Sequence, residues 1–136
     1  MKKIISIIAI ALFTLTLTGC GNKDLEAICK AANGEIMTIN FKNNKIVKIV
    51  SELTKTYEDE TLLNMAYQST QMTAEAYNTV AGSSAEVTKK DNSITMKLTF
   101  DVSKMTKEEI DEADLDDKPK EFIKDVEEEG YTCTIK

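Results

Sequence analysis

Residues 93–103, SITMKLTFDVS, alternate between apolar and polar side chains along their whole length. Successive side chains of an extended strand point to opposite faces, so the alternation predicts one face on a core and the other in water. Such two-faced strands are typical of antiparallel sheets. The apolar face carries Ile94, Met96, Leu98, Phe100 and Val102, and the polar face carries Thr95, Lys97, Thr99 and Asp101. We therefore expect an antiparallel sheet around this strand.

Short turn sequences separate the other strand-like stretches of the chain. Asn33-Gly34 is the strongest two-residue turn signal, because both residue types tolerate a positive φ. Asn43-Asn44 and Asp91-Asn92 are weaker signals of the same kind. The strands predicted around these turns cover residues 26–31, 35–42, 45–56 and 84–90.

One long helix is predicted between the two groups of strands, over residues 59–81. Apolar and small side chains recur there at helical spacing, and we expect that stripe to face the sheet. Asp59 is the expected N-cap, and Gly82 is the expected residue just past the C-terminus. The stripe consists of Leu62, Met65, Ala66, Ser69, Met72, Thr73, Ala76 and Val80.

The sequence after residue 103 changes to helix-forming patterns. Thr106 and Glu109 match a capping box, which predicts a short helix as far as Ala113. Pro119 suits the first position of a last helix ending at Glu129, and residues 131–135 form a final strand. The predicted order is βββ-α-ββ-α-α-β, an α+β fold with helices packed on an antiparallel sheet.

The N-terminus has the pattern of a lipoprotein signal peptide. Two lysines precede an apolar stretch, residues 4–16, which is shorter than the roughly 20 residues that a spanning helix needs. It ends in Leu17-Thr18-Gly19-Cys20, which resembles a bacterial lipobox. The resemblance implies a diacylglycerol on the Cys20 sulfur and cleavage just before it. An ordinary secretory signal with an unrelated cysteine is the alternative.

This interpretation divides the chain into three parts. They are a signal peptide (1–19), a lipidated tether (20–25) and a single α+β domain (26–136).

The composition excludes several kinds of function. The 136 residues include 17 Lys, 9 Asp and 14 Glu, no Arg, no His and no Trp, with a net charge of −6. Without His there is no Ser-His-Asp or Cys-His nucleophile and no His metal ligand. The acidic balance argues against nucleic-acid binding, which needs a basic surface. We expect no catalytic residue, no cofactor and no nucleic-acid partner.

Cys29 and Cys133 remain once Cys20 is assigned to the lipid. The compartment outside the membrane permits disulfides. A bond between them closes a loop of about 105 residues, for which the chain-entropy model gives about 4.7 kcal/mol. It requires Cα atoms about 4.4–6.8 Å apart, and hence neighbouring strands. Two buried free thiols are the alternative.

In layout, the chain resembles the YehR-like family of small bacterial lipoproteins. The shared features are the lipobox at Cys20, a cysteine soon after it at Cys29, the turn at Asn43-Asn44-Lys45, the alternating strand 94–100 and the corner Glu129-Gly130-Tyr131. The likeness covers most of the chain after the signal peptide. It implies an α+β fold and no assigned activity.

An acidic segment near the C-terminus is the candidate for cation binding. Residues 107–129 hold 12 carboxylates against 4 lysines. Asp114, Asp116 and Asp117 are the candidate ligands, yet a loop starting at Asp114 has Lys118 where an EF-hand requires an oxygen ligand. A solvated acidic surface is the expected role.

Both faces of the hairpin over residues 35–56 carry apolar groups. With two-residue turns, Cys29 lies opposite Thr38 and Phe41 lies opposite Ile46. We expect helices or sheet curvature to cover both faces. If helices cover only one, an apolar contact surface remains for a protein partner or ligand. That surface is Met37, Ile39, Phe41, Ile46 and Val50, or the opposite set.

These observations predict a non-catalytic, lipid-anchored binding module on the extracytoplasmic face of the cell membrane. Its expected partners are the membrane, through the N-terminal lipid, and an envelope protein. One alternative is a calcium-dependent or carboxylate-based protein that uses residues 108–129. Another is a purely structural envelope lipoprotein. The sequence does not identify a ligand.

Overall fold

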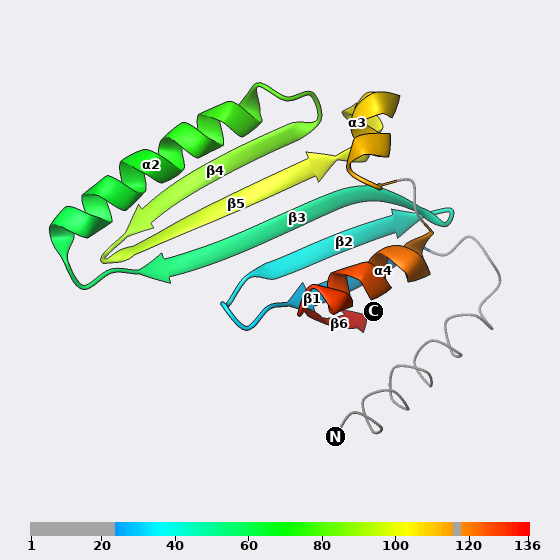
Figure 1. Ribbon diagram of the computed structural model, residues 1–136, viewed down its shortest axis with the longest axis horizontal. Helices are drawn as coiled ribbons and strands as arrows, with labels where there is room; N and C mark the ends of the chain where they lie inside the picture. The colour runs from blue at the N-terminus through cyan, green and yellow to red at the C-terminus, as the bar shows by residue number, and fades with distance from the viewer. Residues whose placement is uncertain (1–23, 116–117) are drawn as a thin grey trace, which may run out of the picture.

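The computed structural model describes residues 24–115 and 118–136, and its strands form one antiparallel sheet (Figure 1). Across the sheet the strands lie in the order β4-β5-β3-β2-β1-β6. Their bounds are β1 (Leu25–Lys30), β2 (Ile36–Lys42), β3 (Lys45–Thr56), β4 (Ser83–Lys90), β5 (Ser93–Asp101) and β6 (Thr132–Ile135). The predicted fold class and order of elements are confirmed.

The helices of the described residues begin where local sequence signals predict. They are α2 (Glu60–Asn78), α3 (Lys107–Glu112) and α4 (Pro119–Glu128), with a 3₁₀ turn η1 (Val102–Lys104) after β5. Asp59 caps α2 by accepting from the Leu62 N–H at 2.9 Å, and Thr106 and Glu109 form both bonds of a capping box. Within the described residues, no helix is long and apolar enough to span a membrane.

The connection between β1 and β2 is longer than the predicted two-residue turn. Ala31 and Glu35 close a three-residue loop, with the Ala31 N–H donating to the Glu35 carbonyl at 2.9 Å. Gly34 takes a φ of +91°, as in a type I turn followed by a left-handed residue. Because the loop has one residue more, the pairing of β1 with β2 shifts by one. Cys29 therefore lies opposite Met37, and its predicted pairing with Thr38 is wrong.

The end of α2 also differs from the prediction. The helix stops at Asn78 and Thr79 is its C-cap, so Gly82 is not the residue that ends it. Gly82 instead has a φ of +74° in the turn into β4, where its carbonyl accepts from the Asp101 N–H at 2.6 Å. A Cβ there would lie 2.6 Å from the Asp101 carbonyl oxygen. The glycine is needed for this close approach rather than for the helix terminus.

All the described helices pack on one face of the sheet. The register aligns Ile39, Ile49 and Phe100 on that face. Tyr77 of α2 contacts Phe100 edge to face at 6.1 Å, and Ile123 of α4 belongs to the same core cluster as Ile39. The main core lies under α4 and contains Ala27, Cys29, Ile39, Phe41, Ile46, Ile49, Val102, Leu115, Ile123 and Val126.

This arrangement overturns the predicted exposed apolar surface on the hairpin. Phe41 and Ile46 pair as predicted, but a register shift between Asn40 and Phe41 places Ile39 opposite Ile49 on the same face. Ile39 is 0% exposed, and Phe41 and Ile46 are each 3% exposed. Met37 is half-buried against this core, and Val50 is half-buried on the opposite face. The set therefore divides between the core and the open side of the sheet.

Candidate functional site

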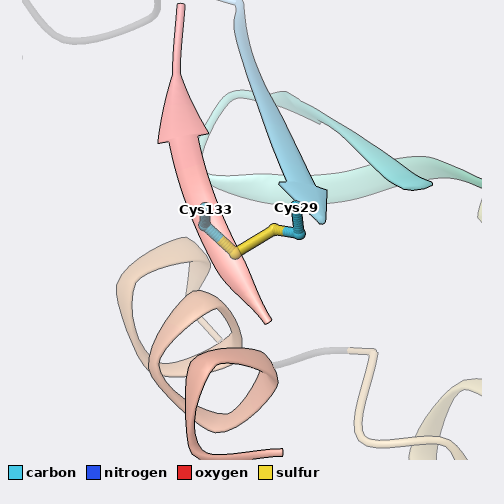
Figure 2. The surroundings of a disulfide bond; sticks show 2 residues. All are labelled: Cys29 and Cys133. Carbon is cyan, nitrogen blue, oxygen red and sulfur yellow. A yellow bond between two sulfur atoms is a disulfide. The ribbon is translucent and has the colours of Figure 1, made fainter. Parts of the chain in front are cut away.

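The disulfide predicted from the cysteine positions is present between Cys29 and Cys133. The residues lie directly opposite each other on β1 and β6, with a Cα–Cα distance of 4.0 Å (Figure 2). The separation is just below the expected range because the two residues are direct cross-strand partners. Cys29 is 0% exposed and shares the core cluster with Ile123 and Val126 of α4. The bond fastens the edge strand β6 to the first strand.

A small polar cluster joins Glu35, just before β2, with Ser51 of β3 and Tyr131, just before β6. Glu35 accepts a hydrogen bond from the Ser51 hydroxyl at 2.5 Å. Burial raises the pKa of Tyr131, and the hydrogen bond and negative charge of Glu35 raise it further, with a smaller effect from Glu129. The Glu35 carboxylate thus acts on both β3 and the corner before β6.

The face of the sheet opposite the helices is polar and rich in hydroxyl groups. One row across it consists of Ile28, Thr38, Val50 and Thr99, each in register with the next. Further along the same face, hydroxyls bond between β3 and β5, at 2.7 Å for Thr54 and Thr95 and at 2.9 Å for Thr56 and Ser93. Only one side of the sheet is covered by the described helices, so the prediction of two covered faces is wrong.

The stripe of α2 that was expected to face the sheet faces solvent instead. Leu62, Met65 and Met72 are 57%, 63% and 71% exposed. Ser69 and Ala76, on the same side of the helix, are also exposed. Exposed large apolar side chains in a row are unusual on a monomer and are typical of an interaction surface. We call Leu62, Met65, Ser69, Met72 and Ala76 the α2 seam.

Contacts with the sheet edge fix the rotation of α2. Leu63 and Ala74 are its buried residues, at 6% and 5% exposed. Lys89 of β4 donates to the Asn64 side chain at 2.7 Å and lies 5.6 Å from the centre of the Tyr67 ring. These contacts hold one side of the helix against β4, so the opposite side points outward, as Figure 1 shows for α2 at the margin of the sheet.

The last contact of α2 is made by Asn78 with the outer edge of β4. Its side-chain nitrogen donates to the Ala85 carbonyl at 3.1 Å, and its side-chain oxygen accepts from the Ala85 N–H at 2.8 Å. One amide thereby occupies both backbone groups of Ala85, as a neighbouring strand would. This contact blocks part of an otherwise open sheet edge.

A shallow depression of about 320 Å³ lies at the start of β1. It is open to solvent, and its charged groups are partly paired: Glu26 accepts from the Asn40 side chain at 3.1 Å and lies 3.9 Å from the Lys136 ammonium. Its lining has two carboxylates, two ammonium groups and a few apolar atoms, so it does not favour one class of ligand. Its lining is Asp24, Leu25, Glu26, Asn40, Phe41, Lys42, Val47 and Lys136.

The acidic segment forms an exposed surface in the part that is described. Asp114 is exposed, with a φ of +52°, while Asp116 and Asp117 lie outside the described residues. Among the residues with described positions, no three His, Cys, Asp or Glu side chains are grouped so as to hold a metal ion. Cys20, the predicted lipidation site, also lies outside the described residues.

No family model matches the sequence, and no curated protein matches it. The NMR structure of the E. coli YehR protein is similar, with a TM-score of 0.50 at 21% identity over 64% of this chain and 66% of that one. The NMR structure of a protein from Streptococcus pneumoniae TIGR4 is also similar, with a TM-score of 0.56 at 14% identity over 86% of this chain and 88% of that one. The chain therefore has a YehR-like fold.

Proposed function

We propose that this protein is a non-catalytic, lipid-anchored binding module on the extracytoplasmic face of the cell membrane. The observation that carries the proposal is the combination of a lipobox ending at Cys20 with a buried cross-strand disulfide between Cys29 and Cys133. The lipobox lies at the N-terminus and the disulfide lies in the folded domain. Both favour a location outside the cytoplasm.

The disulfide supports export because of where it lies. Cys29 is completely buried in the core, and the bond joins two strands 104 residues apart in sequence. Disulfides of this structural kind persist in oxidising compartments and are rare in the cytosol. The lipobox adds the means of retention, because two acyl chains on Cys20 bind a membrane far more firmly than one.

The fold similarity supports membership of the YehR-like lipoprotein family. The E. coli YehR structure is similar in fold over 64% of this chain. In this chain the lipobox, Cys29 and the Glu129-Gly130-Tyr131 corner stand in the order that the family layout predicts.

A binding role is favoured because the fold exposes a surface that its own stability does not use. The α2 seam presents Leu62, Met65 and Met72 to solvent, at 57–71% exposure, while the helix packs through its other side. Keeping large apolar side chains in water gains nothing for the monomer. The seam is therefore the surface through which we expect the protein to bind.

The compartment is tested by intact-mass measurement of the protein extracted from its native membrane. We expect a chain that starts at Cys20 and carries a diacylglycerol-sized addition, and a gain of two hydrogens on reduction. A Cys20→Ser variant is the matched control, and it should lose the lipid mass while keeping the disulfide. An unlipidated full-length chain with free thiols would refute the proposal.

The binding role is tested by site-specific photo-cross-linking in whole cells. A photoreactive residue at Met72 should give discrete protein adducts, whereas one at Glu86, which is exposed on the open face of the sheet, should not. Adducts at both positions or at neither would exclude α2 as a binding surface. The mass and the cross-linking results are independent, so either half of the proposal can fail alone.

A further inference from the structure

The exposed side of α2 has the residue spacing of a helix that pairs with another helix. Members of the seam follow one another at intervals of three, four, three and four residues, the spacing of a and d positions in a heptad repeat. Thr79, the C-cap, continues the series by three residues. Such a series keeps one straight line of side chains facing a partner helix along the whole of α2.

The sizes of the side chains in the seam favour an antiparallel partner with the same sequence. In antiparallel pairs each a position faces a d position, so a two-fold axis between Ser69 and Met72 sets long side chains against short ones, as close packing requires. In a parallel pair Met65 would instead face Met65 and Ser69 would face Ser69. The methionine layers would be overpacked, and the serine layers would leave cavities. The antiparallel contacts are Met72 with Ser69, Met65 with Ala76, and Leu62 with Thr79.

The residues that flank the seam are compatible with self-pairing in a chain of net charge −6. In the antiparallel register Gln68 flanks Glu75 of the second copy on one side of the seam, and Ala66 flanks Thr73 on the other. Glu75 thus meets an amide, so no carboxylate meets another across the seam. The helix contains no lysine, which makes an anionic membrane surface a poorer occupant of the seam.

We propose that α2 is a self-association surface, through which two copies of this chain pair antiparallel along the seam. The helix has 19 residues and is about 28 Å long at about 1.5 Å per residue, so the interface is at the small end of specific interfaces. The dimer is therefore weak and reversible. The inference goes beyond the proposed function and does not depend on the lipid.

The first experiment is cysteine cross-linking of the full chain in its native membrane. In the proposed register Ser69→Cys places the two thiols beside the two-fold axis, only three residues apart along the pair of helices. Gln71→Cys, an exposed position on the same helix but away from the seam, is the matched control. With a short bismaleimide, we expect a cross-linked dimer from position 69 and only background from position 71. Equal yields at the two positions would overturn the proposal.

The second experiment tests the antiparallel register by exchanging charges. Met65→Lys and Ala76→Glu should each weaken dimerisation by about tenfold or more, because each puts a charge into the apolar seam. Their combination should restore the dimer, since position 65 of one copy meets position 76 of the other. The two positions are 11 residues apart on one helix and do not touch within a chain.

Three results of the charge exchange would contradict the antiparallel pair. They are a dimer unaffected by either single substitution, a double variant no better than the single ones, and a wild-type chain that stays monomeric by light scattering in mild detergent. Because Met65 is 63% exposed and Ala76 is exposed, both substitutions should leave the fold intact, which circular dichroism checks. If the mass experiment finds no lipid on Cys20, the charge exchange is still a valid test, because it measures dimerisation of the purified chain.

Discussion

Tyr131 is a residue whose ionisation the fold changes. Burial first, and Glu35 second, raise the pKa of its phenol above the ordinary value. The folded protein therefore holds the phenol proton more tightly than the unfolded chain does. The stability from this effect is complete below the unfolded pKa of about 10 and is lost as the pH rises through the folded pKa.

A Tyr131→Phe substitution should flatten the alkaline part of the stability profile. Between roughly pH 9 and pH 11, the free energy of unfolding of the wild-type protein should fall more steeply than that of the variant, because only the wild type releases this proton on unfolding. Urea denaturation at several pH values measures both slopes. Since both proteins share the same lysines, equal slopes would show that Tyr131 does not contribute.

Among the glycines that the structure describes, Gly82 is the one where adding a methyl group should cost most. Gly82→Ala combines a left-handed φ of +74° with a Cβ 2.6 Å from the Asp101 carbonyl oxygen, and we expect a loss of about 1–3 kcal/mol. Gly34→Ala is the matched control, because it has a φ of +91° but nothing within 4 Å. Its cost should be about 1 kcal/mol. Urea midpoints that fall equally would contradict the role assigned to the contact with Asp101.

At the scale of the elements, α2 shows why helical spacing predicts a helix but not its buried side. The helix carries two series whose intervals alternate between three and four residues, and the more hydrophobic one is exposed. In the other series Tyr67 contacts Lys89 of β4 and Tyr77 contacts Phe100 of β5, and bonds from Asn64 and Asn78 to β4 fix the rotation. The sequence of α2 alone does not reveal these partners, Lys89 and Ala85 of β4. The series that faces the sheet contains the buried Leu63 and Ala74 and the half-buried Tyr67, Thr70 and Tyr77.

Helix starts were predictable because their signals are local, whereas turn lengths were not. Asp59, Thr106 and Pro119 act within one helical turn, so a few residues determine each start. The Asn33-Gly34 pair is compatible with a two-residue or a three-residue loop. The choice depends on which register buries Cys29 beside Met37, and that requires the whole sheet.

Asn78 should stabilise the junction of α2 and β4 strongly although its side chain lies near the surface, because it bonds both backbone groups of Ala85. Asn78→Ala leaves both backbone groups of Ala85 without their partner, and we expect a loss of about 1–3 kcal/mol and faster amide exchange at Ala85. Asn64→Ala, on the same helix, is the control, since it removes only an exposed bond to Lys89 of β4 and should cost far less. Unchanged exchange at Ala85 would contradict this role for Asn78.

At the scale of the whole molecule, the Cys29–Cys133 bond links the first and last strands. We expect Cys29→Ser combined with Cys133→Ser to lower the free energy of unfolding by about 2–5 kcal/mol, because the unfolded chain is released from a very long loop. Urea denaturation should give the reduced wild-type protein nearly the same value. Cys20→Ser should have no such effect. A double variant as stable as the oxidised wild type would show that the fold does not depend on the bond.

The bond has a mechanical consequence, because the two ends of the described fold leave it side by side. The Lys136 N–H donates to the Glu26 carbonyl at 2.8 Å, and the disulfide lies three residues further along each strand. A pull between the two ends would pass from β1 through the sulfur atoms to β6. The chain between the cysteines would carry none of that load. A force applied between the two ends of the described fold would therefore leave most of the sheet, and all of α2, undistorted.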